Sequence, residues 1–257
     1  MTRAAVSRAA PAPQPSRRAG PVLTYFRRAE LPLHSLAFLL PLMVIYELGT
    51  SLVVSSPGGA TQRIIAFTLM QRFFTFFGAT GLYLPPLAVV GILMGAHIAR
   101  RDPWQIDLST LMGMLLESIV LAVPLLAIGV AAARYATMSA PSQAHSASLL
   151  VLSLGAGIYE ELVFRLIAFG ALSFLLMDLM GMKPGISNLL MVSISSVLFA
   201  AYHYLGPEAF QWRTFAFRTA AGAYFGGIFV LRGFGITAGT HAAYDTILVL
   251  LRVLPVR

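Results

Sequence analysis

Seven long apolar runs, each separated from the next by charged residues, proline or glycine, constrain this chain more than any other feature. They lie near residues 33–54, 82–99, 107–133, 148–177, 187–205, 215–231 and 235–254. A helix that crosses about 30 Å of hydrocarbon at about 1.5 Å per residue needs roughly 20 residues, which is the length scale of these runs. The pattern therefore predicts an all-α fold, a polytopic bundle of membrane-spanning helices.

The composition agrees with a membrane environment. Only 11% of the residues are charged while 58% are hydrophobic, whereas soluble chains carry about 25% charged residues and need them to cover a surface that faces water. The lipid bilayer is therefore the expected partner, and a soluble enzyme, a disordered protein and a nucleic-acid binder are all disfavoured. The net charge of +8 comes from Lys and Arg placed between the apolar runs, as juxtamembrane charges are. The absence of cysteine excludes disulfides, thiolate metal sites and thiol nucleophiles.

The N-terminal segment differs from the rest of the chain. Residues 1–24 are rich in Ala, Pro and Arg, so they predict a disordered basic tail ahead of an integral membrane domain at 25–257. A secretory signal would place an apolar core directly after its basic region. Here prolines, Arg27 and Arg28 intervene before the first apolar run. We expect a multi-pass protein of the inner membrane with a cytoplasmic N-terminus.

Residues 62–80 are the ambiguous element. They can form an amphipathic helix in the membrane interface, or cross the membrane and turn back at Gly78 to Gly81. With the N-terminus inside and Arg165 left out, seven spans place ten Lys and Arg inside and seven outside. Eight spans bury Arg72 and divide the rest eleven to five, a split that the positive-inside rule prefers. Charge counting therefore favours eight spans over seven.

Charged residues inside a predicted span point to function, because an ionisable side chain is costly in hydrocarbon. The run 148–177 contains Glu160, Glu161 and Arg165. At about 100° per residue, Glu161 and Arg165 lie about 40° apart and can pair, whereas Glu160 and Arg165 lie about 140° apart. Glu160 is thus left unpaired in an apolar setting, where a carboxylate can serve as a general base near neutral pH. A helix-stabilising charge cluster or a proton-relay carboxylate is the alternative interpretation.

Two further polar pairs share helix faces in later spans. Phe199 and His203 lie four residues apart near the end of one apolar run, and His241 and Asp245 lie four residues apart in the last run. A lone histidine in an apolar helix is more often a hydrogen-bonded structural residue than a catalytic one. Two histidines on separate helices, together with an uncompensated carboxylate, favour a catalytic site. Serine chemistry has less support, because no GxSxG context surrounds the serines that precede His203, which are Ser193, Ser195 and Ser196.

Two other spans carry a single carboxylate each. Glu47 and Glu117 have no cation nearby in the sequence. We expect a packing contact, or a contact that supports other polar groups, rather than catalysis from both residues.

The three motifs together resemble one known family. They read EExxxR at Glu160–Arg165, FxxxH at Phe199–His203 and HxxxD at His241–Asp245, in that order on successive apolar segments. In these motifs the chain is similar to the CPBP family, also called Abi or CAAX-protease-like, which includes the prenyl-protein endopeptidases. The resemblance covers about residues 148–250, and residues 1–147 contribute only anchoring spans to it. Small residues let helices approach closely, and a glycine-spaced stretch ahead of the last motif also fits the family: Gly222, Gly226 and Gly227.

What the resemblance implies is proteolysis inside the membrane. In this family the first Glu of the pair and the His of the second motif activate a water molecule, which assigns Glu160 as the base and His203 as its partner. The His and the Asn or Asp of the last motif bind the developing oxyanion, a role that falls on His241 and Asp245. Peptide hydrolysis needs both functions, and a chain without cysteine must supply them without a thiol. The other motif residues, Glu161, Arg165 and Phe199, are expected to support the site.

The Asp at position 245 departs from the Asn that CAAX-type members often carry. An amide can donate to an oxyanion, whereas an ionised carboxylate would repel it. Either Asp245 is protonated in its apolar setting, or it orients His241 by accepting the other ring N–H. A third alternative is a divalent metal such as zinc, held by Glu160, His203, His241 and Asp245. Metal-free catalysis without a cofactor is the favoured interpretation, because no HExxH is present and the ligands are dispersed over three helices.

The sequence therefore predicts an intramembrane endopeptidase that cleaves a peptide bond near the C-terminal tail or membrane anchor of a protein substrate. Prenylated CAAX tails are the best-known substrates of the family that it resembles. A proton-coupled transporter or channel with Glu160 as the carrier is the alternative, although no internal repeat is visible. A non-catalytic immunity or scaffold protein on the same fold is the third hypothesis.

Overall fold

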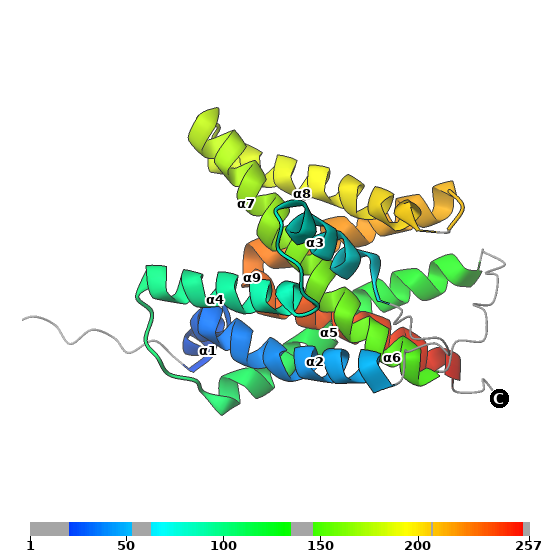
Figure 1. Cartoon of the computed structure of the whole chain (residues 1–257), viewed down its shortest axis with the longest axis horizontal. Coiled ribbons are helices and arrows are strands. Elements are labelled where there is room, and N and C mark those ends of the chain that lie inside the picture. Colours follow the sequence, from blue (N-terminus) through cyan, green and yellow to red (C-terminus); the bar gives the residue numbers. More distant parts are fainter. Residues whose placement is uncertain (1–20, 53–62, 135–145, 207, 254–257) are drawn as a thin grey trace, which may run out of the picture.

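The computed structural model describes residues 21–52, 63–134, 146–206 and 208–253, and every regular element within these ranges is a helix. In chain order the elements are α1 (Pro21–Ala29), α2 (Pro32–Leu52), α3 (Ile65–Phe76), α4 (Leu84–Arg100), α5 (Leu108–Arg134), α6 (Ser146–Gly155), η1 (Ala156–Glu160), η2 (Leu162–Ile167), α7 (Ala168–Ser173), η3 (Phe174–Leu179), α8 (Pro184–Tyr202), η4 (His203–Leu205) and α9 (Trp212–Val253). The predicted all-α bundle is confirmed (Figure 1). Most of the predicted tail at 1–24 lies outside the described residues, and residues 21–24 form the start of α1.

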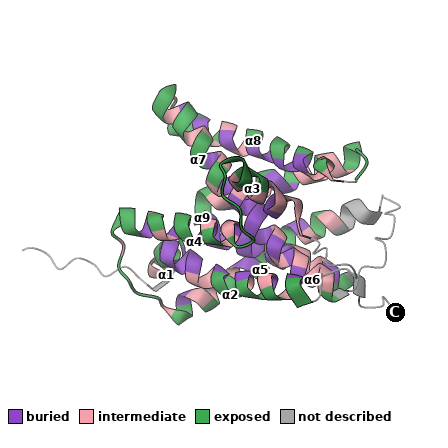
Figure 2. Cartoon of the chain, viewed as in Figure 1, coloured by how far each residue is buried: buried purple, intermediate pink, exposed green. Residues whose placement is uncertain are grey.

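The long helices have the length and surface of membrane spans. Five helical segments of the described chain are long and apolar enough to cross a membrane, namely α2, α5, the continuous run from α6 to η3, α8 with η4, and α9. The shorter apolar helix α4 has 17 residues. Large apolar side chains such as Leu116, Val120 and Val123 are exposed along α5, and Figure 2 shows the buried residues gathered where helices meet. Because an apolar surface of this extent faces lipid rather than water, the chain is a multi-pass membrane protein.

The last two predicted spans form one long element that is broken in its middle. Within α9, Gly233 has φ 75° and ψ −175°, a backbone conformation outside the helical region. Glycine adopts this conformation because it has no Cβ to clash with the neighbouring carbonyl. The two halves of α9 (orange and red in Figure 1) diverge from this point, so the predicted division between 215–231 and 235–254 is confirmed.

The prediction of an eighth span over residues 62–80 is wrong. α3 has 12 residues, which makes it about 18 Å long and too short for about 30 Å of hydrocarbon. Arg28, which precedes α2, forms an ion pair with Asp107, which follows α4, at 3.1 Å. The backbone N–H of Asp107 also donates to Nε2 of His34, near the start of α2, at 3.4 Å. The start of α2 and the end of α4 therefore lie on the same side of the bundle. Because α2 crosses in one direction and α4 crosses back, α3 between them does not cross.

Charge counting failed here because it treats every arginine as a free determinant of topology. Arg63, just before α3, is instead neutralised inside the bundle by Glu47 of α2, with 2.8 Å between Nη1 and Oε2. Arg72 of α3 lies exposed and needs no burial. When the two halves of α9 are counted separately and α4 is included, the described helices match the seven predicted apolar runs.

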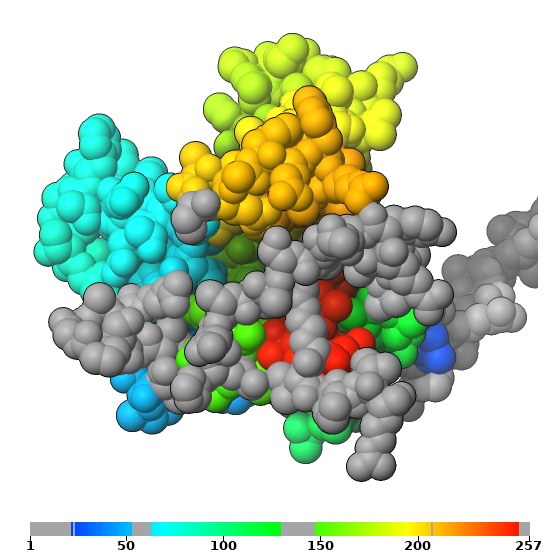
Figure 3. Space-filling view, turned by 90° about the vertical axis from the view of Figure 1, so that its right-hand side faces the viewer, coloured from blue at the N-terminus to red at the C-terminus, as the bar shows by residue number. Residues whose placement is uncertain are grey.

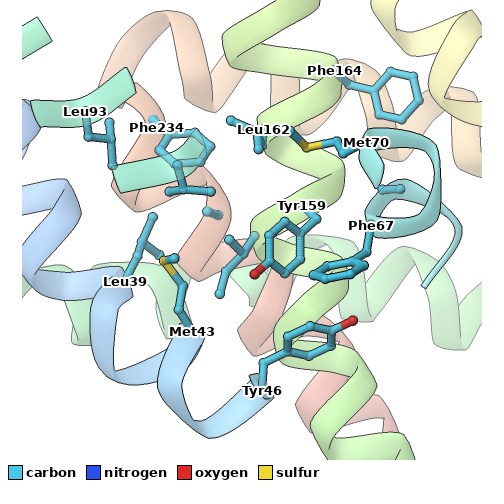
Figure 4. Close-up of a cluster of buried hydrophobic side chains, with 14 of the residues drawn as sticks. Leu39, Met43, Tyr46, Phe67, Met70, Leu93, Tyr159, Leu162, Phe164 and Phe234 are labelled. Atoms are coloured by element: carbon cyan, nitrogen blue, oxygen red, sulfur yellow. The ribbon is translucent and has the colours of Figure 1, made fainter. Parts of the chain in front are cut away.

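A cluster of aromatic rings anchors α3 to the bundle. Tyr46 of α2, Phe67 of α3 and Tyr159 of η1 meet with ring centroids 5.0 to 6.0 Å apart, as Figure 4 shows. All three side chains are fully buried, and such pairs contribute about 0.5–1.5 kcal/mol each beyond their buried area. α3 is therefore packed directly beside the segment that carries the EExxxR motif.

Candidate active site

The EExxxR motif lies where the central helix changes its hydrogen-bonding pattern. η1 and η2 are π-helical turns on either side of Glu161, and such turns within α-helices are frequent at functional sites. Just before the motif, Gly157 lies so close to α9 that an added Cβ would be 2.5 Å from the backbone nitrogen of Ala242. This glycine therefore lets η1 approach α9, which brings both glutamates of the motif against His241.

Glu160 lies inside the bundle and faces both motif histidines. Its side chain is 8% exposed, and its Oε1 accepts a hydrogen bond of 3.1 Å from the Tyr202 hydroxyl. Its Oε2 lies 3.8 Å from Nε2 of His203 and 3.9 Å from Nε2 of His241. These separations exceed those of direct hydrogen bonds. One carboxylate oxygen thus converges with two imidazole nitrogens without being bonded to either.

His203 is the first residue of η4, at the end of α8. Its Nδ1 lies 2.7 Å from the carbonyl oxygen of Phe199. Because a carbonyl oxygen only accepts, Nδ1 carries the proton, and in the neutral ring Nε2 keeps its lone pair on the side of Glu160. His203 can therefore take a proton at Nε2.

His241 is held on two sides. Its Nδ1 lies 2.8 Å from Oε1 of Glu161, and its ring stacks on Phe225 with centroids 4.5 Å apart and an interplanar angle of 15°. Its Nε2 lies 3.5 Å from Oδ2 of Asp245. Both ring nitrogens thus have a carboxylate beside them, and the alternative in which Asp245 orients the ring stays a prediction. Glu161 bonds Nδ1, and Asp245 approaches the same nitrogen that faces Glu160.

Glu161 and Arg165 form a buried ion pair, as their helical spacing predicts. Their side chains are 0% exposed, and Oε2 of Glu161 lies 3.0 Å from Nε of Arg165. Nη2 of Arg165 donates to the carbonyl oxygen of Gly222 at 3.0 Å, and its guanidinium lies 5.1 Å from the centroid of the Phe199 ring. The pair therefore ties the central helix to α9 and α8, and Glu161 links the arginine to His241.

Two of the three predicted packing glycines make close contacts. A Cβ on Gly222 would lie 2.9 Å from Cα of Ser196, and one on Gly226 would lie 3.3 Å from Val192. Gly227 has no atom within 4 Å of such a Cβ, so it does not serve close packing. The serines that precede His203 are used by the backbone: the hydroxyl of Ser195 donates to the Phe164 carbonyl oxygen at 2.8 Å, and those of Ser193 and Ser196 donate to carbonyl oxygens one turn earlier.

The exposure of the site residues indicates from which end the cluster is reached. The side chains of Glu160 and His241 are 8% and 5% exposed, whereas those of His203 and Asp245 are 21% and 28% exposed. Access is therefore from the end of the bundle at which α8 ends. Figure 3 looks onto this end, where α3 (cyan) lies beside the end of α8 (yellow to orange), with the second half of α9 (red) below.

The metal alternative requires several ligands around one point. Within the described ranges, no group of three His, Asp or Glu side chains lies close enough to hold a metal ion. One nitrogen of each imidazole is directed at a protein acceptor, Phe199 for His203 and Glu161 for His241, which leaves Nε2 of both rings available to a water or to another ligand.

Sequence reasoning missed two contributors to the cluster. Tyr202 hydrogen-bonds Glu160, and Phe225 stacks on His241. Tyr202 directly precedes the motif histidine, but no spacing rule marks it, because its partner Glu160 lies 42 residues earlier. Phe225 lies between two glycines of the packing stretch, and its ring reaches the site only because α9 folds back at Gly233.

The fold and this cluster define an α-helical membrane protein with a buried glutamate and two histidines at its centre. Residues 141–247 match a family model described as type II CAAX prenyl endopeptidase Rce1-like. The matched region is less than half of the chain and contains all three motifs. No curated protein and no solved structure matches. The resemblance to the CAAX-protease-like family is confirmed by this match, and residues 141–247 are similar to that family, a family of proteases.

Proposed function

We propose that the chain is an intramembrane endopeptidase that hydrolyses a peptide bond near the C-terminal tail or membrane anchor of a protein substrate. The observation that carries this proposal is the convergence of Oε2 of Glu160 with Nε2 of His203 and Nε2 of His241, at 3.8 and 3.9 Å. Distances of this size between polar atoms suit a bridging water. A water there could contact Oε2 of Glu160 and an imidazole nitrogen at the same time.

In the proposed reaction, Glu160 and His203 activate the water. The water oxygen attacks the carbonyl carbon of the substrate while its proton passes to the carboxylate or to Nε2 of His203. The tetrahedral intermediate then collapses, the C–N bond breaks, and the same proton is given to the departing nitrogen. The products are a carboxylic acid, which keeps the second proton of the water, and an amine, with no covalent bond to the protein.

His241 supplies the second function, stabilisation of the oxyanion. With Nδ1 donating to Glu161, Nε2 can donate only when the ring is the doubly protonated imidazolium. We propose this state for His241, because the carboxylates of Glu160, Glu161 and Asp245 surround its ring, and Nε2–H then donates to the developing charge. Asp245 lies 3.5 Å from the same nitrogen, so an ionised carboxylate would compete with the oxyanion for that proton. We therefore propose that Asp245 is protonated when substrate is bound and donates alongside His241.

The orientation in the membrane follows from the seven-span arrangement. Outside Arg165, ten Lys and Arg fall on the side of the N-terminus and seven on the other, which favours a cytoplasmic N-terminus under the positive-inside rule. The end of the bundle from which the cluster is reached then lies on the side of the inner membrane opposite the cytoplasm. Single cysteines introduced at Tyr204 and at Arg101 into this cysteine-free chain report the two sides with a membrane-impermeant maleimide, and labelling of Arg101→Cys but not Tyr204→Cys in intact cells would reverse the assignment.

The function is tested with substitutions that remove the proposed base and its histidine partner. Glu160→Gln and His203→Ala should each abolish processing of a co-expressed substrate at normal expression, and Glu208→Gln, a change at an exposed ion pair, serves as the matched control. Normal processing by either site variant would refute the protease assignment and favour a scaffold or transporter. Activity that survives chelation of divalent metal supports the metal-free mechanism, while loss that zinc restores would replace it with the metal alternative.

A further inference from the structure

The Tyr202 hydroxyl lies between the catalytic carboxylate and the backbone of α3. It accepts a hydrogen bond of 2.8 Å from the backbone N–H of Ala66 and makes one of 3.1 Å with Oε1 of Glu160. Both contacts are buried, and the residues involved lie far apart in sequence. A single hydroxyl thus joins three elements, α3, η1 and α8.

The direction of these two hydrogen bonds follows from the groups themselves. A backbone amide can only donate, so the phenolic oxygen accepts from Ala66 and its one proton remains for Glu160. Oε1 of Glu160 is therefore occupied by a donor, and rotation about the last side-chain bond is opposed. Oε2 is left to face the two imidazoles.

The hydroxyl also serves the start of α3. The first turn of a helix leaves backbone N–H groups without intrahelical acceptors, and the N-cap residue of α3, Ile64, has no side chain that can accept them. Tyr202 meets this need from another helix by accepting from Ala66. Loss of the hydroxyl would therefore leave a buried donor of α3 unsatisfied, which is unfavourable.

A second tie holds the same end of α3. Arg63 pairs with Glu47 at 2.8 Å, and its guanidinium lies 4.3 Å from the centroid of the Phe67 ring. Glu47 also accepts a hydrogen bond of 2.9 Å from the hydroxyl of Tyr159, the residue before Glu160. Tyr159 and Glu160, which are consecutive in η1, are thus each connected to the α3 segment, Tyr159 through Glu47 and Glu160 through Tyr202. Figure 4 shows the rings of Phe67 and Tyr159 in contact.

We propose that Tyr202 is a positioning residue for Glu160 and that α3, although it does not cross the membrane, is part of the catalytic apparatus because its backbone holds Tyr202. This inference rests on the proposed function. α3 orients the hydroxyl, the hydroxyl orients the carboxylate, and the carboxylate presents its free oxygen to the histidines.

The kinetic test compares two tyrosines. Tyr202→Phe keeps the ring that packs on Phe164 and His203 and should lower kcat about 10- to 100-fold with KM within about threefold, since it removes a hydrogen bond to a charged group without touching substrate. Tyr224→Phe removes a hydroxyl that donates to Leu121 at 2.7 Å on the other side of α9 and should leave both constants unchanged. An unchanged kcat in Tyr202→Phe would overturn the proposal.

The role of α3 is tested by a double-mutant cycle. Arg63→Ala should lower kcat in the wild-type background and have little further effect in the Tyr202→Phe background, because both changes interrupt one chain of contacts. Equal effects in the two backgrounds would show that α3 does not act through Tyr202 and would overturn the coupling.

A labelling experiment separates this inference from the proposed function. Met70→Cys places a thiol on the buried face of α3, and its reaction with a small maleimide should be at least threefold faster when combined with Arg63→Ala or Tyr202→Phe than alone or with Tyr224→Phe. This readout does not depend on hydrolysis. If Glu160→Gln hydrolyses like the wild type, the proposed function fails while the labelling still tests the tie to α3; if labelling is unaffected, the tie itself is refuted.

Discussion

Two clusters of charged residues in this bundle, one around Glu117 and one around Glu160, differ in how completely they are paired. Arg232, at the break in α9, contacts both oxygens of Glu117 at 2.6 and 3.0 Å and Glu30 at 2.8 Å. Tyr25 also donates to Glu117 at 2.5 Å. Glu160, in contrast, has one oxygen bonded to Tyr202 and the other 3.8 to 3.9 Å from two imidazoles.

This contrast separates a carboxylate that holds helices together from one that is proposed to act on a substrate. Glu117 has a direct partner on each oxygen, so it holds α1, α5 and α9 together and has no capacity left for another molecule. Glu160 keeps one oxygen free of direct bonds at a point where two histidines converge. Both carboxylates lie within apolar runs of the sequence, and their partners in space separate the two roles.

The strongest contrast is expected when each of the two glutamates is neutralised separately. Glu160→Gln should lower the hydrolytic rate roughly 100- to 10,000-fold, the usual contribution of a general base, and leave the melting temperature unchanged or higher, because it removes a buried charge near Glu161 and Asp245. Glu117→Gln should lower the melting temperature and keep the rate per folded molecule. Rates and thermal unfolding in detergent are measured on the same preparations. A lower melting temperature for Glu160→Gln than for Glu117→Gln would contradict the contrast.

The second prediction concerns the fully buried pair beside the site. Arg165→Met removes the ion-pair partner of a fully buried carboxylate, leaves Glu161 with only its contact to His241, and should lower the free energy of unfolding by about 3–5 kcal/mol. Arg232→Met should cost less, because the side chain of Arg232 is 11% exposed and water can approach the group. Unfolding in mixed micelles with increasing denaturing detergent measures both variants. Equal losses would mean that depth of burial does not distinguish the pairs.

The third prediction tests the close approach that assembles the site. Gly157→Ala would place a Cβ 2.5 Å from the backbone nitrogen of Ala242 and should cost about 1–3 kcal/mol by overpacking, while lowering the rate because η1 moves away from His241. Gly170→Ala is the matched control on the same long helix, where an added Cβ meets no atom within 4 Å. That variant should keep full activity. Full activity in Gly157→Ala would contradict the inference that this close contact sets the geometry of the site.

The smallest effect is a pH dependence at the opposite end of the bundle. Hydrogen bonds from the hydroxyls of Thr110 and Ser109, together with Arg28, lower the pKa of Asp107 from its ordinary 3.8 to about 2. A carboxyl whose pKa is lower in the folded state stabilises the fold above its ordinary pKa and loses that contribution as pH falls through the folded value. The difference in melting temperature between the wild type and Asp107→Asn should therefore shrink from about pH 5 to about pH 2. A difference that stays constant across this range would refute the assignment.

The class of protein and the residues proposed for the site follow from patterns in the amino-acid sequence. The length of the apolar runs is a local property, so the all-α membrane bundle and the seven runs follow from it directly. The pairing of Glu161 with Arg165 is also local, because helical spacing places them on one face. The three motifs, read together, were sufficient to indicate the CAAX-protease-like family.

Which polar side chains contact one another became visible in the three-dimensional fold. Glu161 bonds His241 across 80 residues, and Tyr202 joins Glu160 to α3, because Gly157 and the π-helical turns set how closely η1 approaches α9. The number of spans was also decided in space, since the contact between Arg28 and Asp107 returns α4 to the side where α2 begins. A local sequence pattern predicts which residues share one face of a helix. Contacts between helices depend on the fit of side chains that are remote in the chain, so no local pattern predicts them.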